Sequence, residues 1–198
     1  MSTNVGLGWG MGGEGWGDGW PPAVARGLLG GPEGQPSPHP PSPNPHPPLV
    51  IGIGNGLRGD DAAGPMVAAL LNRRLGGEVA LVSGGDVAEL IALWEGREAV
   101  VVVDAMTSGR PPGTVVRYDG VLGSLPVQMF ARSTHAFGLA EAVELSRALG
   151  ALPARLVIYG IELASTTVGS DPSPAVVAAV QVVVEAIAAE VATHALAQ

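Results

Sequence analysis

Two adjacent carboxylates, Asp60 and Asp61, are the residues whose types and spacing most strongly indicate chemistry. They stand in the stretch VIGIGNGLRGDDAAGPM, residues 50–66, between an apolar run that ends in a glycine-rich turn and a segment with helical spacing. Carboxylates at such a junction can cap the helix, border a nucleotide-binding loop or hold a metal ion. The rest of the sequence discriminates among these three interpretations.

The nucleotide interpretation rests on GNGLRG, which fits the pattern G-x-G-x-x-G at Gly54, Gly56 and Gly59. The dinucleotide fingerprint also needs an acidic residue about twenty residues further on, at the end of the second strand. The second predicted strand ends at Ser83 without one. Two carboxylates at the helix mouth would also repel a pyrophosphate, which binds where amide N–H groups create a positive potential. These mismatches disfavour a nucleotide site.

The helix-cap interpretation explains one aspartate of the pair. An aspartate near a helix N-terminus accepts backbone N–H bonds and interacts favourably with the helix dipole. We interpret Asp60 in this way. A cap does not require a second, adjacent carboxylate, so Asp61 becomes a candidate metal ligand.

Asp104 and His135 are the other candidate ligands. Asp104 ends the apolar run AVVVVDA, and His135 stands in STHAFGLAEAV, in the first turn of a predicted helix. If the strand order begins 2-1-3, the carboxyl ends of strands one and three are neighbours, so Asp61 and Asp104 face one crevice. The helix N-terminus disfavours an imidazolium, so His135 should be neutral and able to bind metal. Two oxygen ligands and one nitrogen ligand suit Ni, Zn, Mn or Fe, whereas a helix cap or turn is the alternative role for Asp104.

Other catalytic chemistries lack their residues. The chain has no cysteine, and it contains neither a G-x-S-x-G nor an H-E-x-x-H motif. Ser133 and Thr134 are neighbours of His135 in sequence, which does not make a nucleophile–base pair. Metal-assisted attack by water, or general acid–base catalysis by two aspartates, are the remaining options. Glu162, which follows the last apolar run, could bind substrate or support the site, but we favour a solvated loop carboxylate.

Alternating strands and helices should position these residues. Apolar runs predict strands at residues 48–53, 78–83, 99–105, 111–120 and 154–162. Helical spacing predicts helices at residues 64–77, 86–96 and 133–150 and from Pro174 onward. Gly76 should end the first helix, and Asp86 should cap the second. The pattern predicts an α/β protein of three layers, with a mostly parallel five-stranded sheet, helices on both faces and residues 111–120 as an antiparallel edge strand.

Composition restricts the organisation and the partners. The 198 residues carry a formal net charge of −8 with only ten scattered Lys and Arg, which disfavours a nucleic-acid partner. Residues 1–48 are rich in Gly and Trp and then in Pro, so we expect a disordered leader before a domain at 49–198. The apolar segment 174–197 contains Glu185 and Glu190, which favours a buried helix over a membrane span. We therefore expect a cytoplasmic protein without a membrane partner.

The motifs GIGNGLRGDDAAG, VVVDA and STHAFGLAEAV together resemble the hydrogenase maturation endopeptidases, over residues 49–190. The resemblance implies a twisted five-stranded sheet flanked by helices. It also implies a peptidase that removes a short C-terminal extension from the large-subunit precursor of [NiFe]-hydrogenase, once nickel is installed. The nickel would be carried by the substrate and contacted by Asp61, Asp104 and His135.

This chain departs from the family pattern in two places. The family often has Glu at the position of Asp61, and its Gly-Gly stretch after the second strand commonly follows Asp and precedes Thr, whereas this chain reads SGGD at 83–86. The second difference bears on substrate selectivity more than on the reaction. Two alternatives to the peptidase are a metal-dependent hydrolase of another small substrate and a non-catalytic binding module of flavodoxin-like shape.

Overall fold

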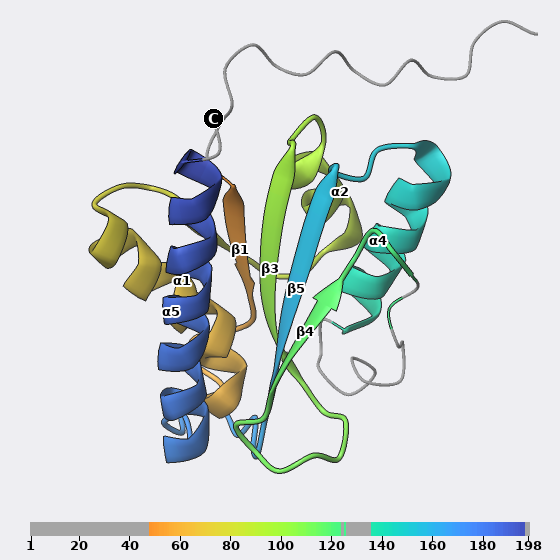
Figure 1. The fold of residues 1–198 in the computed structure, drawn as a ribbon. Helices are drawn as coiled ribbons and strands as arrows, with labels where there is room; N and C mark the ends of the chain where they lie inside the picture. The colour runs from red at the N-terminus through yellow and green to blue at the C-terminus, as the bar shows by residue number, and fades with distance from the viewer. Residues whose placement is uncertain (1–47, 124, 126–135, 197–198) are drawn as a thin grey trace, which may run out of the picture. The chain divides into compact units, whose positions relative to one another are not determined.

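Five strands form one sheet in the order β2-β1-β3-β5-β4, in which β4 is antiparallel to β5 and the other pairs are parallel (Figure 1). This computed structural model describes residues 48–123, 125 and 136–196. The strands are β1 Leu49–Ile53, β2 Ala80–Ser83, β3 Ala99–Met106, β4 Val115–Asp119 and β5 Arg155–Glu162. The order 2-1-3, which was assumed for the first three strands, is the one observed, and the predicted antiparallel edge strand is confirmed. The predicted leader lies outside the described residues.

The helices cover both faces of the sheet. They are the short 3-10 helix η1 Gly59–Ala62 and the α-helices α1 Ala63–Leu75, α2 Val87–Trp94, α4 Ala136–Leu149 and α5 Pro174–Leu196. In Figure 1, α1 and α5 lie on one side of the sheet and α2 and α4 on the other. The predicted three-layer α/β architecture is confirmed.

Local sequence signals set several helix ends. Gly76 has a φ of 70° and its N–H bonds to the carbonyl of Asn72, which ends α1 as expected of a left-handed C-terminal glycine. The Asp86 side chain accepts a 3.0 Å hydrogen bond from the amide of Glu89 and caps α2. Both predictions are confirmed, because each depends only on residues close in sequence.

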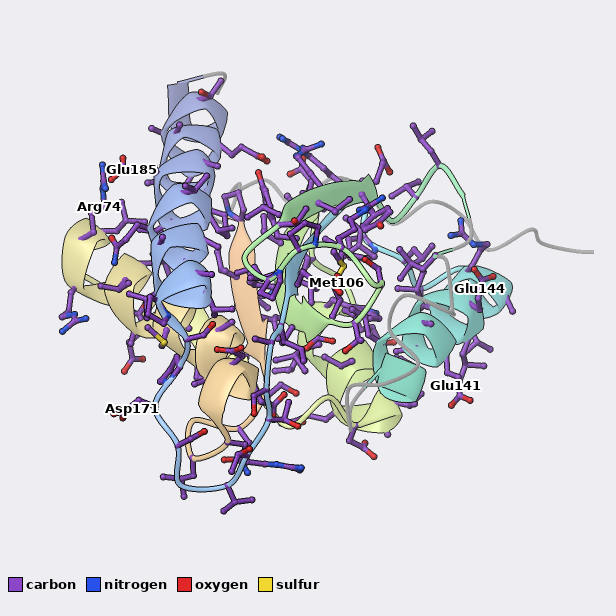
Figure 2. All side chains as sticks on the ribbon, turned by 90° about the horizontal axis from the view of Figure 1, so that it is seen from below. Arg74, Met106, Glu141, Glu144, Asp171 and Glu185 are labelled. Atoms are coloured by element: carbon purple, nitrogen blue, oxygen red, sulfur yellow. The ribbon has the colours of Figure 1, made fainter. Side chains whose placement is uncertain are left out.

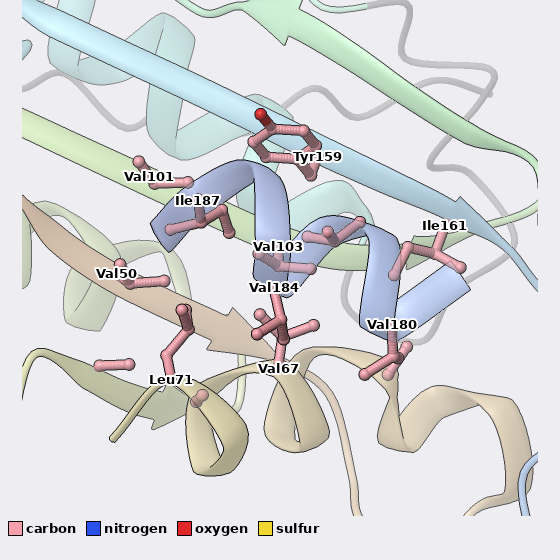
Figure 3. Close-up of a cluster of buried hydrophobic side chains, with 14 of the residues drawn as sticks. Val50, Val67, Leu71, Val101, Val103, Tyr159, Ile161, Val180, Val184 and Ile187 are labelled. Atoms are coloured by element: carbon pink, nitrogen blue, oxygen red, sulfur yellow. The ribbon is translucent and has the colours of Figure 1, made fainter. Parts of the chain in front are cut away.

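Side chains of the central strands alternate between two apolar clusters. On β3, Val101 and Val103 pack with α1 and α5, whereas Val100, Val102 and Met106 pack with α2 and α4. The first cluster is drawn in Figure 3, where the labelled side chains come from the sheet and from both helices. Its labelled members are Val50, Val67, Leu71, Val101, Val103, Tyr159, Ile161, Val180, Val184 and Ile187. Each large apolar side chain buried here contributes about 1.5–3 kcal/mol, so the sheet is a stiff support for its loops.

The alternation on β3 also orients Asp104. Successive side chains of a strand point to opposite faces, and Asp104 has the same parity as Val102 and Met106. Its carboxylate therefore stands on the sheet face that α2 and α4 cover.

Helix α5 is apolar enough to need an explanation. By length and hydropathy alone, Pro174–Thr193 could cross a membrane, with a mean hydropathy of 2.0 and 39% of the stretch buried in the protein. The core helix of a soluble protein passes the same test. Val176, Val180 and Val183 are buried against α1 and the sheet, and this packing accounts for the apolar face of the helix.

An ion pair between Arg74 of α1 and Glu185 of α5 joins the two helices at the surface (Figure 2). Both side chains are largely exposed. Solvent-exposed pairs of this kind contribute about 0–1 kcal/mol. The apolar contacts beneath the pair, rather than the pair itself, therefore hold α1 against α5.

Candidate active site

Glycines in the loop after β1 permit close backbone contacts. A Cβ added at Gly54 would lie 2.1 Å from the carbonyl oxygen of Asp61, and one added at Gly59, where φ is +55°, would lie 2.8 Å from Oγ of Ser170. Nothing lies within 4 Å of a Cβ placed at Gly56. Close packing of the chain on itself thus explains two of the three glycines in the G-x-G-x-x-G pattern without a bound phosphate.

Asp60 is an anchor for the loop that follows β5. Its carboxylate is buried and accepts hydrogen bonds from the amides of Ala164 at 2.7 Å, Ser165 at 3.1 Å and Ser173 at 2.6 Å. The prediction that Asp60 caps the next helix is wrong, since neither η1 nor α1 has a side-chain cap. Burial alone would raise the pKa of Asp60, but the three amides stabilise its charged form and lower the pKa below the ordinary 3.8.

Asp61 is held by the turn that precedes it. Its Oδ2 accepts a 3.1 Å hydrogen bond from the amide of Asn55, and its own amide donates at 3.1 Å to the carbonyl of Arg58. The Asn55 side chain in turn accepts from the amide of Leu57 at 2.9 Å. The carboxylate is buried, so the loop at residues 55–58 sets its position at the carboxyl end of β1.

Asp104 has no hydrogen-bond partner for either carboxylate oxygen within the described part of the chain, and its relative exposure is 0%. Its register partner on β5 is Gly160, which has no side chain to offer. Burial raises the pKa of Asp104 well above 3.8, and the charge of Asp61 raises it further, against a smaller opposing effect of the Ala105 amide. A buried carboxylate without a partner is costly unless it holds a proton or faces a cation.

The structure therefore brings Asp61 and Asp104 to the same end of the sheet, close enough for one charge to change the pKa of the other. This end lies where β1 and β3 are neighbours and the strand order reverses. The role of the two residues as metal ligands stays a prediction.

His135 lies outside the described residues, as do Ser133 and Thr134. The residue after His135 begins α4, and a Cβ added at Gly138 would lie 1.9 Å from the carbonyl oxygen of Gly85. The first turn of α4 thus packs against the loop that follows β2, at the carboxyl end of the sheet. Without His135, the described residues contain no cluster of three histidine or carboxylate side chains able to hold a metal ion.

Glu162 is a second anchor, and the expectation of a solvated loop carboxylate is wrong. It is buried at the end of β5, in register with Met106 of β3. It accepts hydrogen bonds from the amide of Ser108 at 2.8 and 3.0 Å, from the Ser108 hydroxyl at 2.6 Å and from the amide of Gly109 at 2.9 Å. The loop after β3 folds over this carboxylate, a contact between segments 53–54 residues apart. The small residues Ser108 and Gly109 after an apolar strand were the only local signal of it.

The fold and the two carboxylates define a doubly wound α/β protein with an acidic site at the carboxyl ends of its central strands. The profile of the hydrogenase maturation protease family matches residues 65–190, a range that begins just after Asp61 and includes Asp104. The chain belongs to the hydrogenase maturation protease family, which confirms the resemblance found in its motifs.

Individual relatives agree with this assignment. The chain is 32% identical over 119 residues to the hydrogenase expression/formation protein HupD of Thiocapsa roseopersicina, a match over 58% of this chain and 53% of the relative. The chain thus spans about half the length of this curated relative. Among solved structures, the [NiFe] hydrogenase maturation protease HybD of Thermococcus kodakarensis is 30% identical, with a TM-score of 0.58 over 72% of this chain and 96% of that one.

The hydrogenase maturating endopeptidase HybD of E. coli has the same fold. Its TM-score is 0.61 over 74% of this chain and 92% of that one, at 24% identity. At this identity the likeness concerns the fold alone, and it agrees with the predicted five-stranded sheet.

Proposed function

We propose that the protein is an endopeptidase that removes the C-terminal extension of a [NiFe]-hydrogenase large-subunit precursor after nickel insertion. The observation that carries the proposal is Asp104, a fully buried carboxylate without a described hydrogen-bond partner at the point where the strand order reverses. Ligands of doubly wound proteins bind at this point. In a chain of this family, the ligand is the precursor segment to be cut.

The donor set fits a cation brought by the substrate. The two carboxylate oxygens of Asp104 can accept a cation where no protein donor reaches them, and Asp61 contributes its charge beside them. His135 would add a nitrogen ligand, since α4 starts at the next residue and its first turn packs at this end of the sheet. Substrate-borne nickel held in this way would align the scissile peptide with the carboxylates.

Peptide hydrolysis needs two proton transfers. The attacking water loses a proton as it adds to the carbonyl carbon, and the departing amine gains one when the C–N bond breaks. If the two aspartates act instead as general acid and base, the raised pKa of Asp104 suits it to hold the proton and to donate it to the amine. A carboxylate or the substrate-borne metal would polarise the water. The cytoplasmic location expected from the sequence stays a prediction.

The experiment is the trimming of a nickel-loaded precursor by the purified full-length chain, followed by mass spectrometry. Wild type should remove the extension, and His135→Ala should slow removal by about 100-fold or more. His194→Ala, near the end of α5, is the matched control and should cut normally. If His135→Ala removed the extension at the wild-type rate, contact of the nickel by Asp61, Asp104 and His135 would be ruled out.

Metal analysis separates the peptidase from a hydrolase with its own ion. If the substrate brings the nickel, the protein purified without precursor should contain metal well below one equivalent. A tightly held stoichiometric ion would instead favour the metal-dependent hydrolase of another substrate.

A further inference from the structure

Arg58 is an arginine whose charge the described structure leaves unmatched. Its Nε is shielded from solvent and has no hydrogen-bond partner among the described residues. The two Nη atoms are not shielded in this way. Among the other described arginines, Arg74 pairs with Glu185, Arg117 and Arg155 pair with Glu190, and Arg147 pairs with Glu144. Arg73, Arg97 and Arg110 form no ion pair with described residues, but they are exposed, so water solvates their charge. A partly buried guanidinium without an anion is unexpected in a chain whose net charge is −8.

The position of Arg58 connects it to the candidate active site. Its carbonyl accepts the amide of Asp61, so its backbone is fixed one turn from that carboxylate. Among the described ion pairs none involves Arg58, although it lies two and three residues before the carboxylates of Asp60 and Asp61. The guanidinium is therefore available for a group that comes from outside the chain.

The residues beside Arg58 form an apolar rim. Leu57 and Val168 are 75% and 73% exposed. The amide of Gly169 donates to the carbonyl of Leu57 at 2.8 Å, and the amide of Gly59 donates to the carbonyl of Ser170 at 3.2 Å. The loops that carry the two apolar side chains are thus joined through their backbones. The joined loops thus carry exposed apolar side chains and the cation of Arg58 within one short stretch, which suits a peptide that carries an acidic side chain near an apolar one.

We propose that Arg58 is a specificity-determining residue, which binds the side-chain carboxylate of an acidic residue that flanks the scissile bond. This inference rests on the proposed function. The two accessible Nη atoms can donate together to one carboxylate, and the dry, unpaired Nε leaves the charge poorly solvated, which strengthens its attraction for an anion. Because its guanidinium is positively charged, Arg58 would repel the nickel ion. Arg58 would therefore contact the peptide and not the metal. Because the Arg58 backbone is bonded to that of Asp61, we assign the bound residue to the neighbourhood of the scissile bond and not to the far C-terminus.

The test compares Arg58→Met with Arg97→Met in steady-state cleavage of the nickel-loaded precursor. Arg97 is exposed at the opposite end of the sheet, just before β3, so both variants lose one positive charge. Arg58→Met should raise KM by about 10- to 100-fold with kcat changed little, since the contact forms with the bound substrate. Arg97→Met should behave as wild type. Arg58→Lys keeps the positive charge but loses the paired N–H donors of the guanidinium, so it should give an intermediate KM. It replaces the Met variant in the test if that variant does not fold.

A second arm changes the substrate. Each acidic residue that flanks the scissile bond is replaced in turn by its amide. One replacement should raise KM for wild type as much as Arg58→Met does, and should have no further effect on that variant. The assignment would be overturned if the KM of the wild-type enzyme were the same for every substituted precursor as for the natural one. It would also be overturned if the precursor had no acidic residue near the scissile bond.

The two proposals fail in different ways. If wild type leaves the nickel-loaded precursor uncut, the proposed function fails. If wild type cuts the precursor and both Arg58 variants match Arg97→Met, only the role of Arg58 is overturned.

Discussion

Two sets of buried carboxylates lie at the carboxyl end of the same sheet, and they differ in how they are neutralised. Asp60 accepts three hydrogen bonds and Glu162 accepts four. Asp104 has none from the described residues and lies within the electrostatic reach of Asp61. The first set fastens the loops after β5 and β3, whereas the second lies at the end of β1 and β3.

The difference distinguishes acids that anchor loops from the acids that we propose are functional. A hydrogen-bonded buried carboxylate stabilises the folded chain, and a buried carboxylate without partners destabilises it until it gains a proton or a cation. A protein tolerates such a cost where function needs it, so perturbed acids in a cleft indicate an active site. Asp60 and Glu162 hold the loops around the site, and Asp104 is the residue to which we assign the chemistry.

The largest expected effect comes from Asp104→Asn, which should lower kcat for precursor cleavage by about 10²- to 10⁴-fold, because the amide can neither hold a metal as a carboxylate nor transfer its proton. The rate of extension removal, followed by mass spectrometry, measures this. Asp171→Asn, an exposed residue of the loop after β5, is the control and should keep the wild-type rate (Figure 2). Wild-type kcat in Asp104→Asn would place the chemistry elsewhere.

In contrast to Asp104→Asn, Asp60→Asn should act mainly on the stability of the protein and little on kcat. Loss of charge-assisted hydrogen bonds from three amides should lower the free energy of unfolding by about 2–3 kcal/mol at pH 7. Urea denaturation measures the change, with Asp171→Asn again as control. A variant as stable as wild type would show that the loop does not depend on this anchor.

The pH dependence of this loss has a defined sign. Because the pKa of Asp60 is lowered below 3.8 in the folded protein, its stabilisation is fully present above 3.8 and is lost as the pH falls through the folded value. The stability difference between wild type and Asp60→Asn should therefore shrink below pH 3.8. A difference that stays constant down to acid unfolding would contradict the assignment.

Glu162→Gln should have a smaller effect, since the amide oxygen can still accept from Ser108. We expect a loss of about 1–2 kcal/mol in the free energy of unfolding. Hydrogen exchange should also become faster at the amides of Ser108 and Gly109, which donate to this carboxylate. Glu141→Gln on the outer side of α4 is the matched control (Figure 2), and equal exchange in both variants would refute the anchor role.

The last expected effect is of similar size to that of Glu162→Gln but has the opposite sign. Asp104→Asn should raise the free energy of unfolding by about 1–2 kcal/mol at neutral pH, because it removes a charge that the folded state disfavours. A pKa raised in the folded state means that wild type loses stability as the pH rises above 3.8, so the gain should vanish toward pH 3.8. Thermal melts between pH 4 and 8 measure this, and a destabilised variant would show that the carboxylate is satisfied in the protein.

The strands could be predicted because each depends on a local pattern, whereas the order 2-1-3 was only assumed and the places of β5 and β4 come from the structure. The continuous apolarity of VVVV in β3 predicts a strand that is buried on both faces. The polar residues of β4 predict a partly exposed strand at the edge of the sheet. Gly76 and Asp86 end and begin helices through bonds to residues three or four positions away. Asp61 and Asp104 stand out in the sequence because Asp61 follows the glycine-rich turn after β1 and Asp104 lies at the end of the apolar run VVVV.

The roles of Asp60 and Glu162 could not be read in this way. The amides that donate hydrogen bonds to Asp60 lie 104–113 residues away along the chain. The amides that donate to Glu162 lie 53–54 residues away. A side chain chooses its partner among all groups within hydrogen-bond reach, and distance along the chain does not limit that choice once the sheet brings the loops together.

By itself, the sequence determined the layers of this protein, its strands and the carboxylates near their carboxyl ends, because apolar periodicity and turn residues act over a few positions. Only the tertiary structure decided which of four buried carboxylates is satisfied and which is not. Hydrogen bonds and desolvation depend on neighbours in space, and those neighbours are set by packing of the whole sheet.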